Sequence, residues 1–263
     1  MTSGKQSKAQ RRVDSQQRAA EKRAAELRKK RARMAARGGG LLAIVVVIVL
    51  IVVIATSGSN GPSPQTKNPN VPTVAIPASM QLTPAPKTTL GPEQIPVPNG
   101  PRLATLANAA TGQTVDGIQC QTNEQTVTHV HTHLTIFVNG QAREIPYGIG
   151  IPGAVATATS TGPFVSTGSC FYWLHSHAND GIIHVESPSL ADTFTLGEFF
   201  DEWGQPLSTT QVGPATGAVT VFFNGKLYKG DPRNLPLGNH YQIQLDVGTP
   251  IVAPVNITNW GGL

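Results

Sequence analysis

The chain has 263 residues, with 20 Lys and Arg against 15 Asp and Glu and a formal charge of +5. Residues 1–37 hold 13 of the basic residues and three acidic ones, a local charge of +10, so that residues 38–263 sum to −5. The basic excess therefore marks a separate region and gives no support to nucleic acid as a partner. Two cysteines exclude a four-cysteine zinc site within one chain, and glycine-rich nucleotide-binding signatures are absent.

The first 56 residues indicate a membrane anchor. Residues 1–37 contain few apolar side chains larger than Ala, which predicts a solvated basic tail; contact with anionic lipid headgroups or nucleic acid is the alternative. Residues 41–55 (LLAIVVVIVLIVVIA) follow three glycines, and 18 such residues would form a helix of about 27 Å. We expect a transmembrane helix over residues 38–56, with a cytoplasmic N-terminus and the C-terminal domain outside. A cleaved signal peptide is the alternative.

Residues 57–101 are predicted to be a spacer that precedes a single domain. Residues 57–101 hold eleven of the 21 prolines among Ser, Thr, Asn and Gly, which predicts a disordered, extended stalk. Residues 102–263 are long enough for one compact core and form the expected extracytoplasmic globular domain.

Within this domain the pattern is mainly β. Residues 127–138 alternate in polarity and precede Asn139-Gly140, which is a strong hairpin signal, and residues 219–229 repeat the design around Asn224-Gly225. Further strands are expected over residues 171–175, 181–185 and 241–247. One helix is predicted after Thr195, where TLGE is a capping box and apolar residues follow at helical spacing until Gly204.

Six of the seven histidines occur in two short strings, and His240 stands apart. The first string is HVHTH (residues 129–133), in which alternate residues share one face of a strand. The second is HSHANDGIIHVE (residues 175–186), whose Asp180-Gly181 suits a turn. Such pairs on neighbouring strands are typical of a four-coordinate metal site. The predicted ligands are His131, His133, His175 and His177, with His184 as a substitute or as a ligand of a second site.

The remaining polar residues have subsidiary predicted roles. His129 lies about 13 Å from His133 along an extended strand, so we expect it to stand outside the site. Glu186 and Asp180 are expected to orient the imidazoles, or to act as general base if the site is catalytic. Because an all-nitrogen site suits either metal, the ion is predicted to be Zn or Cu.

Cys120 and Cys170 each precede one histidine string. In an oxidising compartment two cysteines in one domain usually pair, so we expect a disulfide that draws the two strings together. Thiolate ligation in a mixed Cys/His site is the alternative.

Two resemblances bear on the fold. The string WLHSHANDGIIHVESP, followed by FTLGEFFDEWG, resembles a motif of uncharacterised exported bacterial domains and implies that residues 170–204 form one unit. The order hairpin, helix, strand pair, strand is similar to β-grasp domains, and residues 194–204 resemble the helix of sulfur-carrier proteins of that fold. The resemblance implies an α+β, mainly β fold, in which the histidine hairpin of residues 170–188 is an insertion between the second strand and the helix.

Three functions fit these patterns. The first is a membrane-anchored extracytoplasmic domain that captures, buffers or senses a divalent transition metal. The second is a structural or adhesive cell-envelope protein, in which the histidines only form hydrogen bonds. The third is a metal-dependent hydrolase, which is disfavoured because no known catalytic string is present. Beyond the lipid bilayer and a metal ion, the sequence predicts no particular partner.

Overall fold

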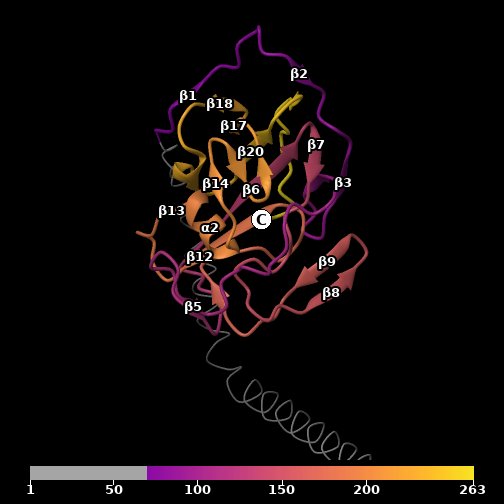
Figure 1. Cartoon of the computed structure of the whole chain (residues 1–263). Helices are drawn as coiled ribbons and strands as arrows, with labels where there is room; N and C mark the ends of the chain where they lie inside the picture. Colours follow the sequence, from indigo (N-terminus) through magenta and orange to yellow (C-terminus); the bar gives the residue numbers. More distant parts are fainter. Residues whose placement is uncertain (1–69) are drawn as a thin grey trace, which may run out of the picture. The chain divides into compact units, whose positions relative to one another are not determined.

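The structure is a computed structural model that describes residues 70–263. This part of the chain is mainly β, with one α-helix (Figure 1). The predicted tail (1–37), the predicted transmembrane helix (38–56) and residues 57–69 of the predicted stalk lie outside the described residues. From residue 70 onward, no helix is both long and apolar enough to cross a membrane.

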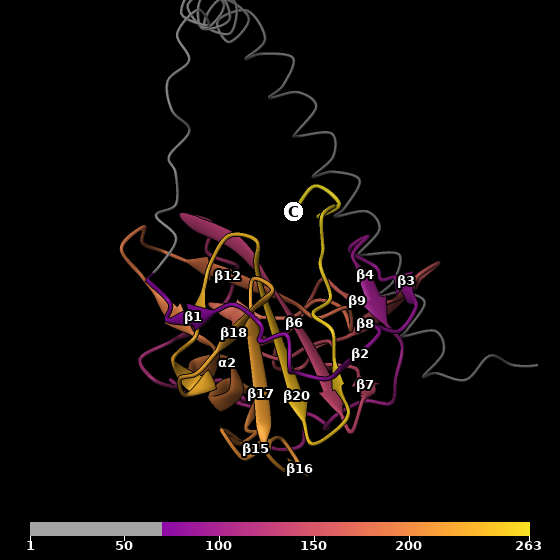
Figure 2. The same cartoon turned by 90° about the horizontal axis from the view of Figure 1, so that it is seen from above.

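An eight-stranded sheet forms the framework. Its strands, in order across the sheet, are β1 (Thr73–Val74), β18 (Lys226–Tyr228), β17 (Val219–Phe223), β20 (Tyr241–Val247), β6 (Thr128–Val138), β12 (Ile182–Ser187) and β11 (Leu174–His175), with β7 (Gln141–Arg143) also paired to β6. β20 and β6 run parallel and the other pairs are antiparallel. Figure 2 shows β17, β20 and β6 side by side.

Both predicted hairpin turns are confirmed. Asn139 and Gly140 join β6 to β7, and both have positive φ angles (51° and 75°). Asn224 and Gly225 join β17 to β18, and their φ angles are also positive (48° and 73°). Asn and Gly tolerate this left-handed conformation, which matches the twist of the flanking strands.

The predicted helix is α2 (Leu196–Trp203). It begins where the Glu198 carboxylate accepts hydrogen bonds from the Thr195 N–H (2.6 Å) and hydroxyl (2.9 Å), and it ends at Gly204, which has a φ of 67°. Its apolar face, including Phe199 and Trp203, is fully buried in the main hydrophobic core. That core joins α2 to the apolar face of the sheet, leaving the opposite face for other contacts.

The histidine hairpin is not an insertion beside the sheet, so that prediction is wrong. β11 and β12 do form a hairpin, but β12 pairs with six residues of β6 and is the second long neighbour of that strand. β7 pairs with only three residues at the far end of β6. Residues 139–181 connect β6 to β12.

The predicted stalk is also wrong for residues 70–101, which contact the domain. β1 pairs with β18, and β2 (Leu82–Thr83) runs parallel to β21 (Ile251–Val252). Ile95 is fully buried against Ile182 and Ile257. Prolines suit such a segment because an edge strand needs few backbone donors.

Smaller pairings complete the fold. They are β3 (Thr88–Leu90) with β4 (Pro96–Pro98), β5 (Cys120–Gln121) with β10 (Phe171–Tyr172), β8 (Ala156–Thr159) with β9 (Gly162–Val165), β13 (Phe194–Thr195) with β19 (Pro236–Leu237), and β14 (Leu207–Ser208) with β15 (Gln211–Val212) and β16 (Ala215–Thr216). A 3-10 helix, η1, covers Pro232–Asn234. The Cys120–Cys170 disulfide is present beside β5 and β10, which confirms the predicted pairing.

Candidate metal centre

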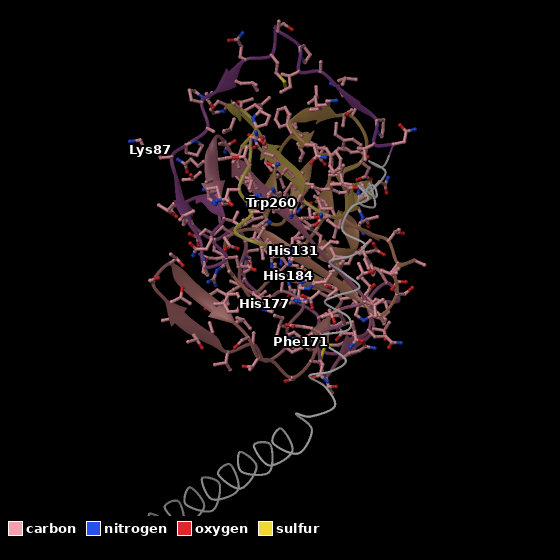
Figure 3. All side chains as sticks on the ribbon, turned by 180° about the vertical axis from the view of Figure 1, so that it is seen from behind. Lys87, His131, Phe171, His177, His184 and Trp260 are labelled. Carbon is pink, nitrogen blue, oxygen red and sulfur yellow. A yellow bond between two sulfur atoms is a disulfide. The ribbon has the colours of Figure 1, made fainter. Side chains whose placement is uncertain are left out.

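The registers of β6, β12 and β11 gather the histidines on one face of the sheet. His184 of β12 lies between His131 of β6 and His175 of β11 in a single row across the three strands. In the next row Glu186 lies opposite His129. Residues two apart along a strand share a face, so these side chains point away from the α2 side. Figure 3 shows His131, His184 and His177 close together near the middle of the domain.

Backbone carbonyls orient two of the imidazoles. His175 Nδ1 lies 2.8 Å from the Tyr172 carbonyl oxygen, and His177 Nδ1 lies 2.5 Å from that of Val165. A carbonyl only accepts, so each Nδ1 must carry the proton. Each Nε2 is then free to bind a metal, as in histidines that ligate metals elsewhere.

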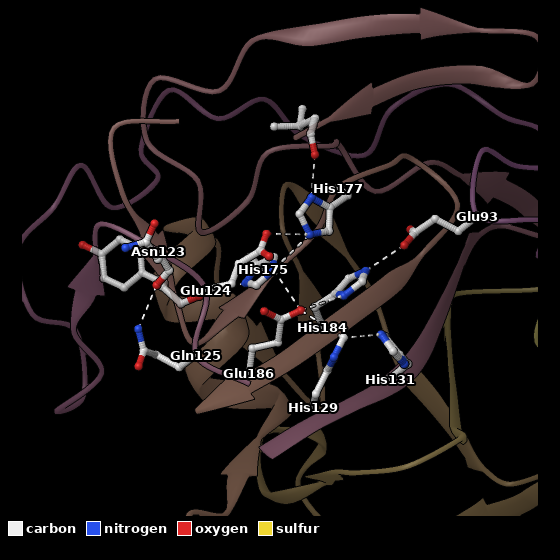
Figure 4. Close-up of polar contacts among 12 residues, drawn as sticks. Glu93, Asn123, Glu124, Gln125, His129, His131, His175, His177, His184 and Glu186 are labelled. Atoms are coloured by element: carbon white, nitrogen blue, oxygen red, sulfur yellow. Dashed lines mark hydrogen bonds and ion pairs between the residues drawn. The ribbon is translucent and has the colours of Figure 1, made fainter. Parts of the chain in front are cut away.

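The first candidate group consists of His175, His177, His184 and Glu186, and all four are buried. Their ligand atoms lie within 4.8 Å of one another. Glu186 Oε1 is 3.8 Å from His175 Nε2 and 3.3 Å from His184 Nδ1 (Figure 4). Two donors bound tetrahedrally to one ion at 2.0–2.1 Å would lie about 3.4 Å apart. The group therefore has the size of a four-coordinate metal site.

The side chains of His175 and His177 are close enough for one cation to bind both. Their Nε2 atoms are 3.1 Å apart. Burial and the neighbouring histidines hold the pKa of His175 well below its ordinary value, and burial followed by His184 lowers the pKa of His177. Because each Nδ1 faces a carbonyl oxygen, both Nε2 atoms are available as metal ligands, and Glu124 Oε1 also lies 3.4 Å from His177 Nε2. A metal ion could bind both nitrogens at once.

The second candidate group consists of His129, His131 and His184. His129 Nε2 lies 3.1 Å from His131 Nε2 and 3.1 Å from Glu186 Oε1. Burial, His184 and His129 lower the pKa of His131 to about 3, so this ring is also neutral. The expectation that His129 stands outside the site was wrong, because Glu186 brings it toward His184.

Glu93 completes the site, although no role was predicted for it because it lies in the presumed stalk. Its Oε1 is 2.7 Å from His184 Nε2. Burial alone would raise the pKa of Glu93, but hydrogen bonding and charge from His184 outweigh burial and lower it. The available signal was that Glu93 is the sole acidic residue between positions 57 and 101.

A tight turn brings Glu93 to the site. The Gln94 N–H donates to the Gly91 carbonyl (3.0 Å), and the Glu93 N–H donates to Asp180 Oδ2 (3.0 Å). A Cβ at Gly91 would lie 2.3 Å from the Asp180 Cβ, so a glycine is needed for this approach. Burial, followed by the charge of Glu93, raises the pKa of Asp180 to about 8.

His184 carries the positive charge of the metal-free site. Burial disfavours its charged form, but hydrogen bonds and charge from Glu186 and Glu93 prevail and raise its pKa to about 9. The single His184 imidazolium then pairs with two carboxylates, those of Glu93 and Glu186. Glu93 Oε2 and Glu186 Oε2 are nevertheless buried and have no hydrogen-bond partner among residues 70–263. Unpaired buried carboxylate oxygens are costly, and a cation would satisfy them.

Two predicted residues lie apart from both groups. His133 is buried where its Nε2 hydrogen-bonds the Asp180 carbonyl (2.9 Å) and its Nδ1 the Thr135 hydroxyl (3.2 Å). Both ring nitrogens are thus used in protein contacts, and burial lowers its pKa to about 4. Asp180 supports the Glu93 turn instead of facing the histidines. Thiolate ligation is excluded because Cys120 and Cys170 are bonded to each other.

One side of the site opens into a pocket of about 620 Å³. Its lining includes the whole second group together with Glu93 and Phe164. His175 is fully buried behind it. The arrangement can therefore bind a divalent metal ion and also admit a small molecule to it.

Comparison of the chain with protein-family models, with curated proteins and with solved structures gives no match.

Proposed function

We propose that this protein is a membrane-anchored, extracytoplasmic metal-binding protein that captures, buffers or senses Zn(II) or Cu(II). The observation that carries the proposal is the contact between His175 Nε2 and His177 Nε2, which lie 3.1 Å apart while both Nδ1 atoms face backbone carbonyls. The unpaired oxygens of Glu93 and Glu186 add negative charge at the same place. Three imidazoles and one carboxylate form a donor set that suits either metal.

The location follows from the chain around the domain. The apolar run at 41–55 and the basic block before it argue for an anchor at 38–56 with the domain outside. The disulfide argues for the same side of the membrane, because such bonds persist in oxidising compartments. A domain so placed would meet metal ions before they enter the cell.

We further propose that the framework is a β-grasp domain. The central strands follow the order β12-β6-β20-β17-β18, with β6 parallel to β20 and α2 between β12 and β17 in the chain. That order, with its parallel central pair, supports the proposal. The metal site would then lie in the segment inserted between the first two strands and on those strands themselves.

Titration calorimetry of the full chain tests the binding proposal. The chain would be purified in detergent without a histidine tag and titrated with Zn(II) and with Cu(II) at pH 7. We expect saturable binding that is lost in the His175→Gln/His177→Gln/His184→Gln variant. His240→Gln is the matched control, because the His240 ring stacks on Trp260 and belongs to neither group. Absence of binding in the parent chain would refute the proposal and favour the structural or adhesive role.

A metal-dependent hydrolase is the second candidate, and the 620 Å³ pocket favours it. Structural metal sites are usually closed, whereas catalytic sites keep an open position for water. Asp180 lies away from the histidines, so Glu186 or Glu93 would be the general base. Hydrolysis of ester substrates by the metal-loaded chain, absent in Glu93→Gln, would support this function.

A further inference from the structure

We propose that the site binds two metal ions that share His184 and Glu186, an inner ion held also by His175 and His177 and an outer ion held also by His129 and His131. The outer ion would take a fifth ligand from the pocket. This inference rests on the proposed metal binding and specifies its stoichiometry and geometry.

The number of donors is the first argument. A four-coordinate ion is already satisfied by the first group, whose members are all buried. His129 and His131 remain, with their Nε2 atoms 3.1 Å apart. That separation is close to the ligand spacing of a second tetrahedral ion, so the remaining pair forms half of another site.

The two shared residues lie between the pairs. β12 is the middle strand of the three, and its neighbours lie about 4.8 Å away on either side. His184 presents Nδ1 to Glu186 and Nε2 to Glu93, so its two ring nitrogens face different partners. Each nitrogen of one imidazole can bind a separate ion once both N–H protons of the metal-free imidazolium have been released to solvent.

Glu186 is suited to the same bridging role. Its Oε1 lies 3.1 Å from His129 Nε2 on one side and 3.8 Å from His175 Nε2 on the other. Its buried Oε2 has no hydrogen-bond partner in the described part of the chain. A carboxylate with two such oxygens can contact both ions.

The two positions differ in access. His175 and His177 are buried, with their Nδ1 atoms fixed by backbone carbonyls. The side chain of His129 is 44% exposed, and His129, His131 and His184 all line the 620 Å³ pocket. His177 also lines this pocket, whereas His175 does not. The inner ion would therefore be held by four buried donors, whereas the outer ion, beside the exposed His129, would have room for water or a small ligand with a nitrogen or oxygen donor.

Copper loading tests the inference. The tag-free full chain would be loaded with excess Cu(II), freed of unbound metal by gel filtration, and measured by elemental analysis and electron paramagnetic resonance. We expect two Cu(II) per chain and the half-field signal of a magnetically coupled pair. His129→Gln, and separately His131→Gln, should bind one Cu(II) and lose that signal. His240→Gln should behave as the parent chain.

Azide tests the fifth position of the outer ion, since it binds Cu(II) and adds a charge-transfer absorption band. We expect the band in the parent chain and its loss in His129→Gln. A parent chain that binds one Cu(II), or two without the half-field signal, would overturn the two-ion site while leaving metal binding intact. A chain that binds no Cu(II) would overturn both proposals, and an unchanged spectrum with azide would overturn the fifth position alone.

Discussion

The same face of the sheet carries two buried polar clusters, and they differ in how their hydrogen bonds are satisfied. The first, here called the amide cluster, consists of Gln242, Gln244 and Asp246 on β20. Gln244 accepts from the Val255 N–H (2.8 Å) and donates to the Asp246 carboxylate (2.8 Å). Gln242 and Asp246 likewise bind backbone groups of residues 252–257. These side chains hold the C-terminal segment against the sheet, much as another strand would.

The second, here called the metal cluster, consists of His129, His131, His175, His177, His184, Glu93 and Glu186. It contains two close pairs of imidazole nitrogens and buried carboxylate oxygens without partners in the described residues. A buried polar group without a partner costs roughly 1–3 kcal/mol. The amide cluster is therefore complete as protein alone, whereas the metal cluster has unpaired donor atoms that could hold a cation.

Removing the disulfide should have the largest effect on stability. It should also disturb the metal cluster more than the amide cluster. Replacing Cys120 and Cys170 by Ala opens a loop of 51 residues and should lower the free energy of unfolding by about 4 kcal/mol. β10 carries Tyr172, whose carbonyl orients His175, so Zn(II) affinity should fall as well. Urea unfolding and calorimetry would measure the two effects. Unchanged Zn(II) affinity would show that the strands position the histidines without the bond.

Breaking the amide cluster should destabilise the domain whether or not metal is present. Gln244→Ala leaves the Val255 N–H, the Val252 carbonyl and Asp246 without this partner. The free energy of unfolding should fall by about 3 kcal/mol. Urea unfolding with and without Zn(II) would show the same loss in both. Gln141→Ala, at an exposed position, is the control and should change little.

Breaking the metal cluster should change stability only when metal is present. At a free Zn(II) concentration 100 times the dissociation constant, binding should stabilise the parent chain by about 2.7 kcal/mol. For a domain of this size the melting temperature should rise by roughly 5–10 °C. His184→Gln should abolish that rise, while Gln244→Ala should keep it. A rise of equal size in His184→Gln would place the stabilising ion elsewhere.

The smallest predicted effect is a pH dependence from the amide cluster. Burial raises the pKa of Asp246 from its ordinary 3.8 to about 6, although hydrogen bonds from Val252 and Gln244 lower the pKa and partly offset the effect of burial. The unfolded chain therefore releases this proton at lower pH than the folded chain. Stability should fall as pH rises, by about 2 kcal/mol between pH 4.5 and 7. Asp246→Asn should lack this contribution, so the difference between the two metal-free chains should vary with pH. A constant difference would contradict the raised pKa.

The main elements were predictable because local patterns agreed with the final fold. The alternation over residues 128–138, the two Asn-Gly turns and the capping box at Thr195 each express a preference that the sheet and helix retain. The pairing of Cys120 with Cys170 followed from their number and placement. Strand order was not accessible, because β12 lies beside β6 only after 43 residues of intervening chain.

The sequence predicted the kind of site, a histidine-rich metal site, but only some of the residues that form it. Period-two spacing placed His175 and His177 together, but it treated His133 as equivalent to His131. The structure separates them, because Asp180 and Thr135 occupy both ring nitrogens of His133. Glu93 could not be found from spacing, since it reaches the site through a turn from a proline-rich segment. Composition described that segment, but composition says little about where an extended chain binds.

X-ray absorption at the zinc edge would test the central claim most directly, with the tag-free full chain loaded with Zn(II). The account predicts nitrogen and oxygen neighbours at about 2.0–2.1 Å and the outer-shell scattering of at least two imidazoles per ion. His184→Gln should lose most of that imidazole scattering, and His240→Gln should keep it. A spectrum of oxygen neighbours without imidazole scattering in the parent chain would contradict a metal centre built from these histidines.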